Sequence, residues 1–497
     1  MTNRERPASA SPGPPSLTPP SSAPPPSAPP PAGPAPFTPP QGAGHPRAVF
    51  AVLALAVFVS TLDVFIVNIA VPAIQAGFAG STVAGVSWVL NAYAIVFAAL
   101  LVPAGRLGDI VGRRRVFTAG LFAFGLGSAL CAASPSLGFL VAARILQGAG
   151  AAAITPTSLG LLLPSIPPRS RAAAIGVWSA LGAVGAASGP SLGGLLTQVS
   201  WHWIFLVNVP LTAIVLVGAY RVLPEIRDPA RPPLPDGLGT LVLIAAVCLA
   251  TLGLVQGHAW DWDGRVIGCF AAAAVLTAVF AVRSRRHRAP VLEPGIVRVP
   301  AFALSAVSAA LFSAAFSAML LANVLFLTGT WHYSIVRAGL ALTPGPVAAA
   351  VCAPFAGRLA QRAGPGLVGG AGAALFGIGS VMWVAFIDAE PAYWSLFFPA
   401  MLVGGGGVGL ALPAFTIAAT STLAPQTLAT GIGAQTMFRQ IGSALGVAAF
   451  VAVFGTPTTA TVIGAHDDVR WFMIASAAGA ALALAFIRRP GGATRSE

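Results

Sequence analysis

The chain is 497 residues long, 56% of them hydrophobic and only 8% charged. Many apolar runs approach the roughly 20 residues that a helix needs to cross a bilayer. Inside a bilayer only helices and closed barrels satisfy their own backbone hydrogen bonds, so this composition predicts a polytopic helical membrane protein without a sizeable soluble domain. The formal net charge of +13 is large enough for nucleic-acid binding, but the positions of the basic residues, all of them arginines, argue against that class.

The chain begins with a stretch rich in Pro, Ser, Ala and Gly that ends near His45. Such a density of proline forbids a helix and favours extended segments. The stretch also lacks the continuous apolar core of a signal peptide. We therefore expect residues 1–46 to form a disordered, Pro-rich cytoplasmic tail.

Apolar runs bounded by charges and helix breakers predict the membrane helices. They predict fourteen spans, near residues 48–74, 86–106, 116–134, 137–163, 171–197, 202–222, 237–257, 265–283, 302–328, 337–358, 366–387, 391–416, 428–455 and 469–487. An even number of spans places both termini on the same side of the membrane.

The placement of arginine predicts which side is the cytoplasm. If the N-terminus lies inside, most of the 27 basic residues fall in inner loops and tails, whereas the outer loops hold only Arg265, Arg337 and Arg470. Short cytoplasmic loops retain positive charge, so this bias predicts a multi-pass protein of the cell membrane with both termini in the cytoplasm. Attraction of the arginines to anionic lipid headgroups is a second expected effect.

Three ionisable residues remain inside predicted spans, namely Asp63, Arg144 and Arg439. Ionisable groups at such depth are costly unless they face a cavity or a partner, so each marks a candidate functional site. A carboxyl that can also exist in its neutral form would suit a proton carrier, which makes Asp63 the candidate for that role. Structural alternatives remain open. Asp63 could simply hydrogen-bond to Asn68 or a neighbouring helix, Arg144 could satisfy backbone carbonyls, and Arg439 could clamp the packing of its helix.

The run 105–115 joins two predicted spans through a very short hairpin and holds the densest charge cluster of the chain. Membrane topology alone explains three consecutive arginines at 113–115. It does not explain Gly105, Gly108 and Asp109. These residues indicate a further role for the hairpin.

The fifth predicted span contains glycines four residues apart, at Gly185, Gly189 and Gly193, together with Pro190 and Gly194. Glycines at this spacing form a flat groove that lets helix backbones approach closely in a bilayer. A proline within the helix bends it or removes one hydrogen bond. The pattern predicts a pliant hinge or a tight seal between helices.

Taken together, these residues resemble the major facilitator superfamily and, within it, the fourteen-span family of drug:proton antiporters. The segments that carry the resemblance are 62–72, 105–115, 144–150, 185–194, 201–210 and 439–442. The resemblance covers the chain from about residue 48 to 487. It implies an all-α integral membrane protein of the major facilitator fold, with two six-helix bundles and two inserted helices.

The resemblance also implies a domain organisation and an activity. After the tail at 1–46, it places the N-terminal bundle at 47–222, two inserted helices with cytoplasmic linkers at 223–300, the C-terminal bundle at 301–488 and a cytoplasmic tail at 489–497. The implied activity is proton-coupled export of lipophilic drugs or secondary metabolites by alternating access. The expected partners are a lipophilic small molecule, protons as the coupling ion and membrane lipids. We expect no cofactor and no nucleic acid, and a monomer.

The resemblance further implies roles for individual residues. It assigns proton coupling to Asp63 and Arg144. It assigns conformational gating to the hairpin residues Gly105, Arg106, Gly108, Asp109, Gly112 and Arg113, of which Asp109 and Arg113 would pair and contact the opposite bundle in the outward-open state. It assigns the antiporter motif of the fifth helix to Gly185, Gly189, Pro190, Gly193 and Gly194. The candidates for the substrate cavity are Asn68, Trp88, Tyr93, Gln147, Asn323, Gln435 and Arg439.

The chain departs from the family pattern at three points. His202 stands where the family usually has Arg, and Gln361 stands where an acid is common in the corresponding hairpin of the second half. The tenth span lacks an acid, and no acid other than Asp63 lies near mid-membrane. A dication would find little compensation, so we expect a lipophilic neutral or monocationic substrate, with aromatic faces available for cation–π contacts.

A polytopic membrane enzyme is the main alternative of a different class. The six histidines fall in the tail, loops or helix ends without metal-ligand spacing, and the four cysteines lie apart inside apolar stretches. We therefore expect neither an enzyme nor a metal site. An uncoupled facilitator or receptor, or a carrier of one narrow substrate, stays open on the same fold, and loss of proton dependence would identify the uncoupled forms.

Overall fold

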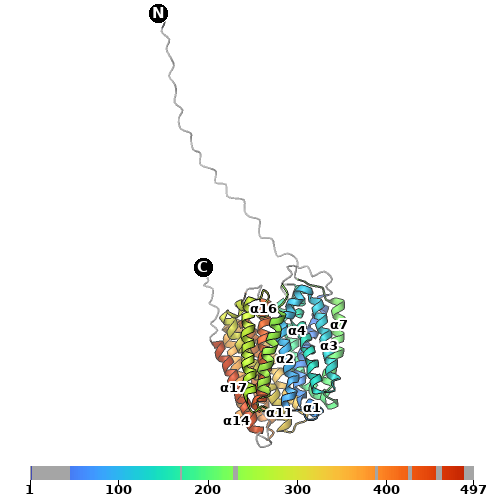
Figure 1. Ribbon diagram of the computed structural model, residues 1–497, viewed down its shortest axis with the longest axis vertical. Coiled ribbons are helices and arrows are strands. Elements are labelled where there is room, and N and C mark those ends of the chain that lie inside the picture. The colour runs from blue at the N-terminus through green and yellow to red at the C-terminus, as the bar shows by residue number, and fades with distance from the viewer. Residues whose placement is uncertain are drawn as a thin grey trace. The chain divides into compact units, whose positions relative to one another are not determined.

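The computed structural model describes residues 2, 45–167, 171–227, 233–386, 390–421, 423, 428–454 and 462–485. Within these residues the regular structure is entirely helical, as the composition predicts (Figure 1). The predicted tails, 1–46 and 489–497, lie almost entirely outside the described residues.

The helices follow the predicted spans closely. Those of the N-terminal half are α1 (Pro46–Gly77), α2 (Val83–Val111), α3 (Arg113–Ala132), α4 (Leu137–Leu162) with the 3₁₀ turn η1 (Leu163–Ser165), α5 (Arg171–Val199), α6 (Trp203–Leu206) and α7 (Asn208–Val222). They are followed by α8 (Gly237–Val255), α9 (Gly264–Arg286) and the short α10 (Pro294–Val297). Those of the C-terminal half are α11 (Pro300–Gly329), α12 (Ile335–Leu342), α13 (Pro344–Ala363), α14 (Pro365–Phe386), the π-helical turn η3 (Tyr393–Phe397), α15 (Phe398–Thr420), α16 (Leu428–Phe454) and α17 (Val462–Ala485).

Several helices begin at a polar side chain that caps them. Thr82 and Ser136 accept hydrogen bonds from first-turn N–H groups of α2 and α4, at 3.0 and 3.3 Å. Asp236 does the same for α8 at 2.8 Å. The first N–H groups of a helix have no partner within it, so these side chains stabilise the helix starts.

Twelve segments of the described residues are long and apolar enough to cross a membrane. Two further helices, α5 and α17, coincide with the predicted spans 171–197 and 469–487 but are not among these twelve. Because several of their side chains lie outside the described residues, the predicted total of fourteen spans is not confirmed.

The helices pack into two bundles and a hairpin. In the first bundle, α1–α7, α1 packs on α5 and α7, and α4 packs against both α2 and α3. In the second bundle, α11–α17, α11 packs on α16 and α17, and α15 packs against both α13 and α14. Helices α8 and α9 pack on each other, and α8 contacts α2 and α16, one helix from each bundle (Figure 1).

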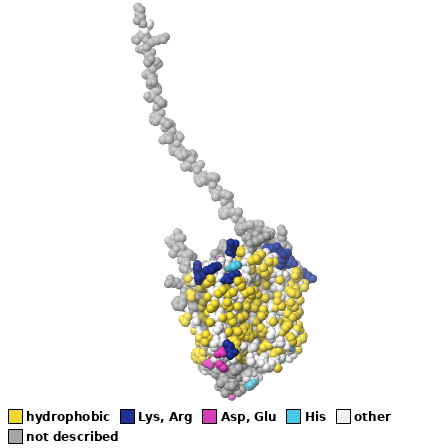
Figure 2. Space-filling model, in the orientation of Figure 1, with side chains coloured by type: hydrophobic (Ala, Val, Ile, Leu, Met, Phe, Trp, Pro, Cys, Tyr) yellow, Lys and Arg dark blue, Asp and Glu magenta, His cyan; other side chains and the backbone are white. Residues whose placement is uncertain are grey.

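The outer surface of the helices is apolar and its charges are segregated. Large side chains such as Phe122, Ile214 and Leu241 are at least 60% exposed, as contact with lipid would require. Figure 2 shows hydrophobic side chains over most of one face, with arginines gathered toward one end of the helices and acidic side chains toward the other. We call the first the arginine-rich end. It contains the hairpin between α2 and α3 and the ends of α7 and α9.

Arg470 is a correction to the predicted layout. It was expected in an outer loop, but it lies on α17 and is only 2% exposed. Its guanidinium carbon lies 4.5 Å from the ring centroid of Trp383 and 5.0 Å from that of Phe326. The helix begins at Val462, earlier than predicted, and aromatic faces replace part of the hydration that the guanidinium loses.

One ion pair joins α8 to α9 at the arginine-rich end. Asp236 is buried, and both of its carboxylate oxygens lie 2.8 Å from Nε of Arg283. Burial raises the pKa of this carboxyl, but the hydrogen bonds from Arg283 and from the Gly239 N–H outweigh burial, so the pKa lies below its usual value. The charged carboxylate is therefore the form that stabilises the hairpin.

Asp236→Asn should lower the free energy of unfolding by about 1.5–3 kcal/mol at pH 7, the usual contribution of hydrogen bonds to charged groups. Since the folded-state pKa lies below the unfolded value of about 3.9, the stabilisation is present above that value and is lost as the pH falls through the folded-state pKa. Thermal unfolding in detergent should therefore show a gap between wild type and variant that closes toward acid pH.

The matched control is Asp263→Asn, which changes the cap of α9. Asp263 pairs with an exposed arginine, Arg265, so this substitution should change the unfolding temperature little. An Asp236→Asn protein as stable as wild type at pH 7 would contradict the proposed role of the pair.

Candidate functional site

A cavity of about 890 Å³ lies between the two bundles. Its walls come mainly from α1, α2, α4 and α5 on one side and from α11 and α13–α16 on the other. Most of its lining side chains are apolar, among them Phe65, Phe316 and Phe376. A cavity shared by both bundles can bind a small apolar molecule and can change its access when the bundles move.

The cavity extends to the arginine-rich end of the helices. There it is lined by Gly105, Arg106, Asp109 and Arg113. Toward the other end of α5 the two bundles are in contact, since a Cβ on Gly194 would lie 3.0 Å from the backbone of α12. The cavity is therefore accessible from the arginine-rich end.

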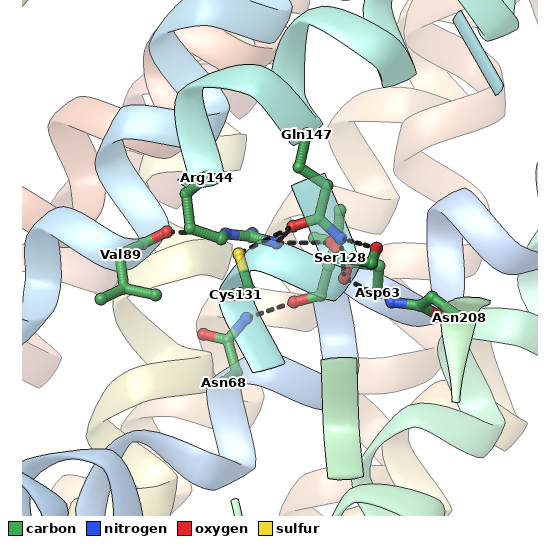
Figure 3. A network of polar contacts seen from close by, with 9 residues as sticks. Asp63, Asn68, Val89, Ser128, Cys131, Arg144, Gln147 and Asn208 are labelled. Carbon is green, nitrogen blue, oxygen red and sulfur yellow. Dashed lines mark hydrogen bonds and ion pairs between the residues drawn. The ribbon is translucent and has the colours of Figure 1, made fainter. Parts of the chain in front are cut away.

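Near the middle of the first bundle, a buried ion pair joins α1 to α4 (Figure 3). Nη1 of Arg144 lies 2.6 Å from Oδ2 of Asp63, and the two residues are only 1% and 0% exposed. Gln147 and Asn208 each donate a hydrogen bond to Oδ1 of Asp63, at 2.8 Å. All three groups are donors, so the arrangement suits a carboxylate that carries its charge.

Arg144 is held from two further directions. Its Nε donates to the Val89 carbonyl at 3.0 Å, and its Nη1 also donates to Oε1 of Gln147 at 2.6 Å. The ring centroid of Tyr93 lies 4.2 Å from the guanidinium carbon. A buried guanidinium needs such replacements for its lost hydration. The alternative in which Arg144 only satisfies backbone carbonyls explains its hydrogen bond to Val89. It does not explain the ion pair with Asp63.

The network reaches other helices, and not all of its members were predicted. Gln147 also donates to the Ser128 hydroxyl on α3 at 2.7 Å. Asn68, one suggested partner of Asp63, instead donates to the carbonyl of Val64 at 2.8 Å, so that pairing is wrong. The other suggestion, hydrogen bonds from Asp63 to neighbouring helices, is confirmed by its contacts with Gln147 and Asn208. Asn208 lies in the segment 201–210 that carries the family resemblance. No sequence signal marks Ser128.

The hairpin between α2 and α3 is built around a second ion pair. Nε of Arg113 lies 2.8 Å from Oδ1 of Asp109, and Nη1 of Arg113 donates to the Gly160 carbonyl on α4 at 2.6 Å. A Cβ on Gly108 would lie 2.9 Å from Thr157, so the glycine lets α2 approach α4. Within the described residues, the hydrogen bonds and ion pairs of Asp109 and Arg113 stay in the first bundle. The contact with the opposite bundle that the resemblance implies for the outward-open state is therefore not among the interactions that the described residues make.

The segment after α7 closes the hairpin. Gly112 has a φ of 125°, a conformation that favours glycine, and an added Cβ would lie 2.7 Å from the carboxylate carbon of Glu225. Glu225 approaches Arg115 at 3.6 Å, and the N–H of Arg113 donates to the Ile226 carbonyl at 2.9 Å. Glu225 could not be predicted from the sequence, because no motif marks it and its partners lie far away in the chain.

The glycines of α5 bring it into backbone contact with α1. A Cβ on Gly185 or Gly189 would lie 2.7 or 2.5 Å from atoms of α1, and Gly193 faces α1 in the same way. Gly194 faces α12 of the second bundle instead, and Pro190 lines the cavity. The flat groove expected from the sequence is thus the surface on which α5 meets α1.

Four of the seven predicted cavity residues line the cavity, namely Asn68, Tyr93, Asn323 and Arg439. The described cavity wall does not include the other three, which were expected there. A helix presents only one face to a cavity, and the sequence alone did not show how each helix is rotated.

The three residues outside the described cavity wall make other contacts. Gln147 belongs to the Asp63 network. Gln435 turns toward α11, where its Nε2 donates to the Ser305 carbonyl at 3.3 Å. Trp88 packs against hydrophobic side chains of the core.

Asn91 is a cavity residue that the sequence analysis missed. It lines the cavity and is 0% exposed, yet neither polar atom of its amide has a hydrogen-bond partner among the described residues. Buried polar groups are usually paired, so this unpaired amide is an exception among the residues of the cavity wall.

The sequence matches a known family over most of its length. Residues 53–447 match the profile of the Major Facilitator Superfamily. The chain is 33% identical over 411 residues to the multidrug resistance protein Stp of Mycobacterium tuberculosis, covering 82% of this chain and 76% of the relative. It is 33% identical over 424 residues to the tetracenomycin C resistance and export protein of Streptomyces glaucescens, covering 83% of this chain and 76% of the relative.

Solved structures agree with this similarity at the level of the fold. The D-xylose–proton symporter superposes with a TM-score of 0.62 at 14% identity, covering 89% of this chain and 97% of that one. A bacterial homologue of the human lysosomal transporter Spinster, in an inward-facing and occupied conformation, superposes with a TM-score of 0.61 at 16% identity, covering 88% and 95%. The chain belongs to the major facilitator superfamily.

Proposed function

We propose that this protein exports lipophilic small molecules from the cytoplasm in exchange for protons, by alternating access of its central cavity to the two sides of the membrane. The observation that carries the proposal is the buried Asp63–Arg144 ion pair at the cavity wall, because ionisable groups at this depth in a membrane protein usually serve a function. Relatives named for multidrug resistance and for tetracenomycin C export support a drug or antibiotic substrate. The family and the fold are those of transporters rather than enzymes.

The proposal includes a membrane topology. Helices α5 and α17, with 29 and 24 residues, are long enough to cross a bilayer and would complete fourteen spans. The arginine-rich end would face the cytoplasm and place both termini there. Since the cavity is accessible from that end, the conformation would be the inward-facing one.

Proton transfer would act on the charge of the cavity wall. A proton that binds to Asp63 neutralises the carboxylate and breaks its ion pair with Arg144. Arg144 lines the cavity and keeps its bonds to the Val89 carbonyl and to Gln147, so it would present an uncompensated charge there. Release of the proton to the cytoplasm restores the pair. Asp63 itself is not among the residues that line the cavity, so the proton site and the substrate site would communicate through Arg144.

The hairpin contacts would make the first bundle move as one body. Arg113 joins α3 to α2 through Asp109 and to α4 through Gly160, and Glu225 ties the segment after α7 to the same hairpin. The two bundles would rock about the contact of α5 with α12 and α13. Gly194 and Pro190 lie at that contact, which suits the proposed role of α5 as a seal or hinge.

Asp63→Asn should abolish proton-coupled export. The amide keeps the size of the side chain but cannot exchange a proton, so substrate-induced proton release from energised inside-out vesicles should fall to the level of vesicles without the protein. The measurement would use a panel of lipophilic cations, anions and neutral antibiotics and would compare equal amounts of inserted protein.

The matched control for this test is Asp261→Asn, an exposed acid in the loop before α9, which should leave proton release unchanged. Undiminished proton release in Asp63→Asn would exclude this residue as the proton carrier. Wild-type efflux without any proton release would instead identify an uncoupled facilitator.

Gly189→Leu should block transport, because even a Cβ at this position would lie 2.5 Å from Phe65 and a leucine would force α5 away from α1. Efflux from vesicles should fall to background while the protein still inserts. Gly268→Leu on α9 is the control, since a Cβ there meets nothing within 4 Å. Normal efflux by Gly189→Leu would remove the hinge or seal from the mechanism.

A further inference from the structure

The charged side chains that line the central cavity are mostly positive. Among the described residues they are four arginines and one acid, namely Arg106, Arg113, Arg144, Arg439 and Asp109. Asp109 is already paired with Arg113 at 2.8 Å. Asp63 is not among the residues that line the cavity, and its carboxylate already accepts hydrogen bonds from three side chains. The cavity thus offers a cationic ligand no free carboxylate in the described part of the chain.

Arg439 differs from Arg144, the other cavity-lining arginine that lies within a predicted span. It lies on α16 on the face that also presents Thr436, Gln440 and Ser443 to the cavity, residues three and four positions apart. In the described chain Arg439 makes no hydrogen bond and no ion pair, whereas Arg144 has both. An isolated guanidinium inside a membrane protein is costly, and a bound anion removes that cost through charge-assisted hydrogen bonds.

The printed contacts of α16 with α11 do not involve the Arg439 guanidinium. The contact between α16 and α11 is made by Gly442 and Gly446, whose absent side chains leave room for the backbone of α11 at Ala310 and Ala314. Arg439 takes no part in this contact through any hydrogen bond that the structure describes. The hypothesis that Arg439 clamps the packing of its helix is therefore not supported by any hydrogen bond of the guanidinium among the described residues.

Two other features of the cavity suit a molecule with one charged end and an apolar body. Phe65, Phe316 and Phe376 provide an aromatic wall, and Phe316 lies 6.1 and 6.5 Å from the other two rings. Asn91 adds a polar side chain to the wall of the same cavity, and its amide has no hydrogen-bond partner among the described residues.

We infer that the cavity binds lipophilic acids, with Arg439 as the anchor for the ligand's carboxylate and the phenylalanine wall in contact with its apolar body. This inference rests on the proposed export function and names its substrate class. It replaces the expectation of a neutral or monocationic substrate, because a cation at this site would meet an unpaired guanidinium. An anion that leaves the cell and a proton that enters it both make the cytoplasm more positive. An inside-negative membrane potential would therefore drive both movements.

Equilibrium binding to the full-length protein in lipid nanodiscs tests the inference, with empty nanodiscs subtracted. Three fluorescent probes share one aromatic body: 1-pyrenebutyrate, its methyl ester and 1-pyrenebutylamine. At pH 7 they are an anion, a neutral molecule and a cation. We expect the butyrate to bind about tenfold more tightly than the ester, and the amine to bind more weakly than both.

Variants then identify the anchor. Arg439→Gln should remove the preference for the butyrate over the ester, Arg439→Lys should retain part of it, and Arg288→Gln, which changes an exposed arginine, should leave it intact. Ester or amine binding as tight as butyrate binding in wild type would overturn the inference whatever the variants do. The same holds if none of the probes binds, or if Arg439→Gln retains the full preference.

Binding requires no proton gradient, so this test separates the two proposals. Selective butyrate binding without proton-coupled export would keep the anion site and reject the proposed transport cycle. Proton-coupled export without butyrate selectivity would keep the cycle and reject the anion site.

Discussion

The ion pair between Asp63 and Arg144 is the constraint on which the first bundle depends. Both charges are removed from water, and breaking such a pair by removing one partner typically costs about 3–5 kcal/mol. The pair stays stable because donors and acceptors from α2, α4 and α7 replace the lost hydration, and those groups must be in register to do so. The same contacts place Asp63 behind the cavity wall and Arg144 in it, so one guanidinium separates the site proposed for protons from the site proposed for substrate.

Close backbone contact within each bundle is the second constraint. Lipid is as apolar as leucine, so helices in a membrane gain little from hydrophobic burial and associate through packing and hydrogen bonds. Glycines provide that packing between α5 and α1, and between α16 and α11, where Gly442 and Gly446 face the α11 backbone. The hairpin contacts of Arg113 and Glu225 add polar ties at the arginine-rich end. Two bundles that are tightly packed inside and share an open cavity are suited to move as units.

Much of the fold follows from local properties of the sequence, and much of the site does not. Apolar length predicted the helices, and the segments 105–115 and 144–150 predicted the family, because hydropathy and short motifs are read along the chain. Trp88 and Gln435 were predicted in the cavity wall but are not part of the wall that the structure describes, since composition does not show which face a helix turns inward. Ser128, Asn91 and Glu225 were missed because their importance comes from elements distant in sequence.

The sequence by itself determined that this is a helical membrane protein of the major facilitator superfamily, with its arginines concentrated on one side and three ionisable residues within its predicted spans. Only the tertiary structure decided what those three residues do to the cavity. Asp63 and Arg144 meet and largely cancel, whereas Arg439 meets no acid in the described chain. The physical reason is that the charge a cavity presents depends on distances between side chains from different helices, and a sequence contains the charges without those distances.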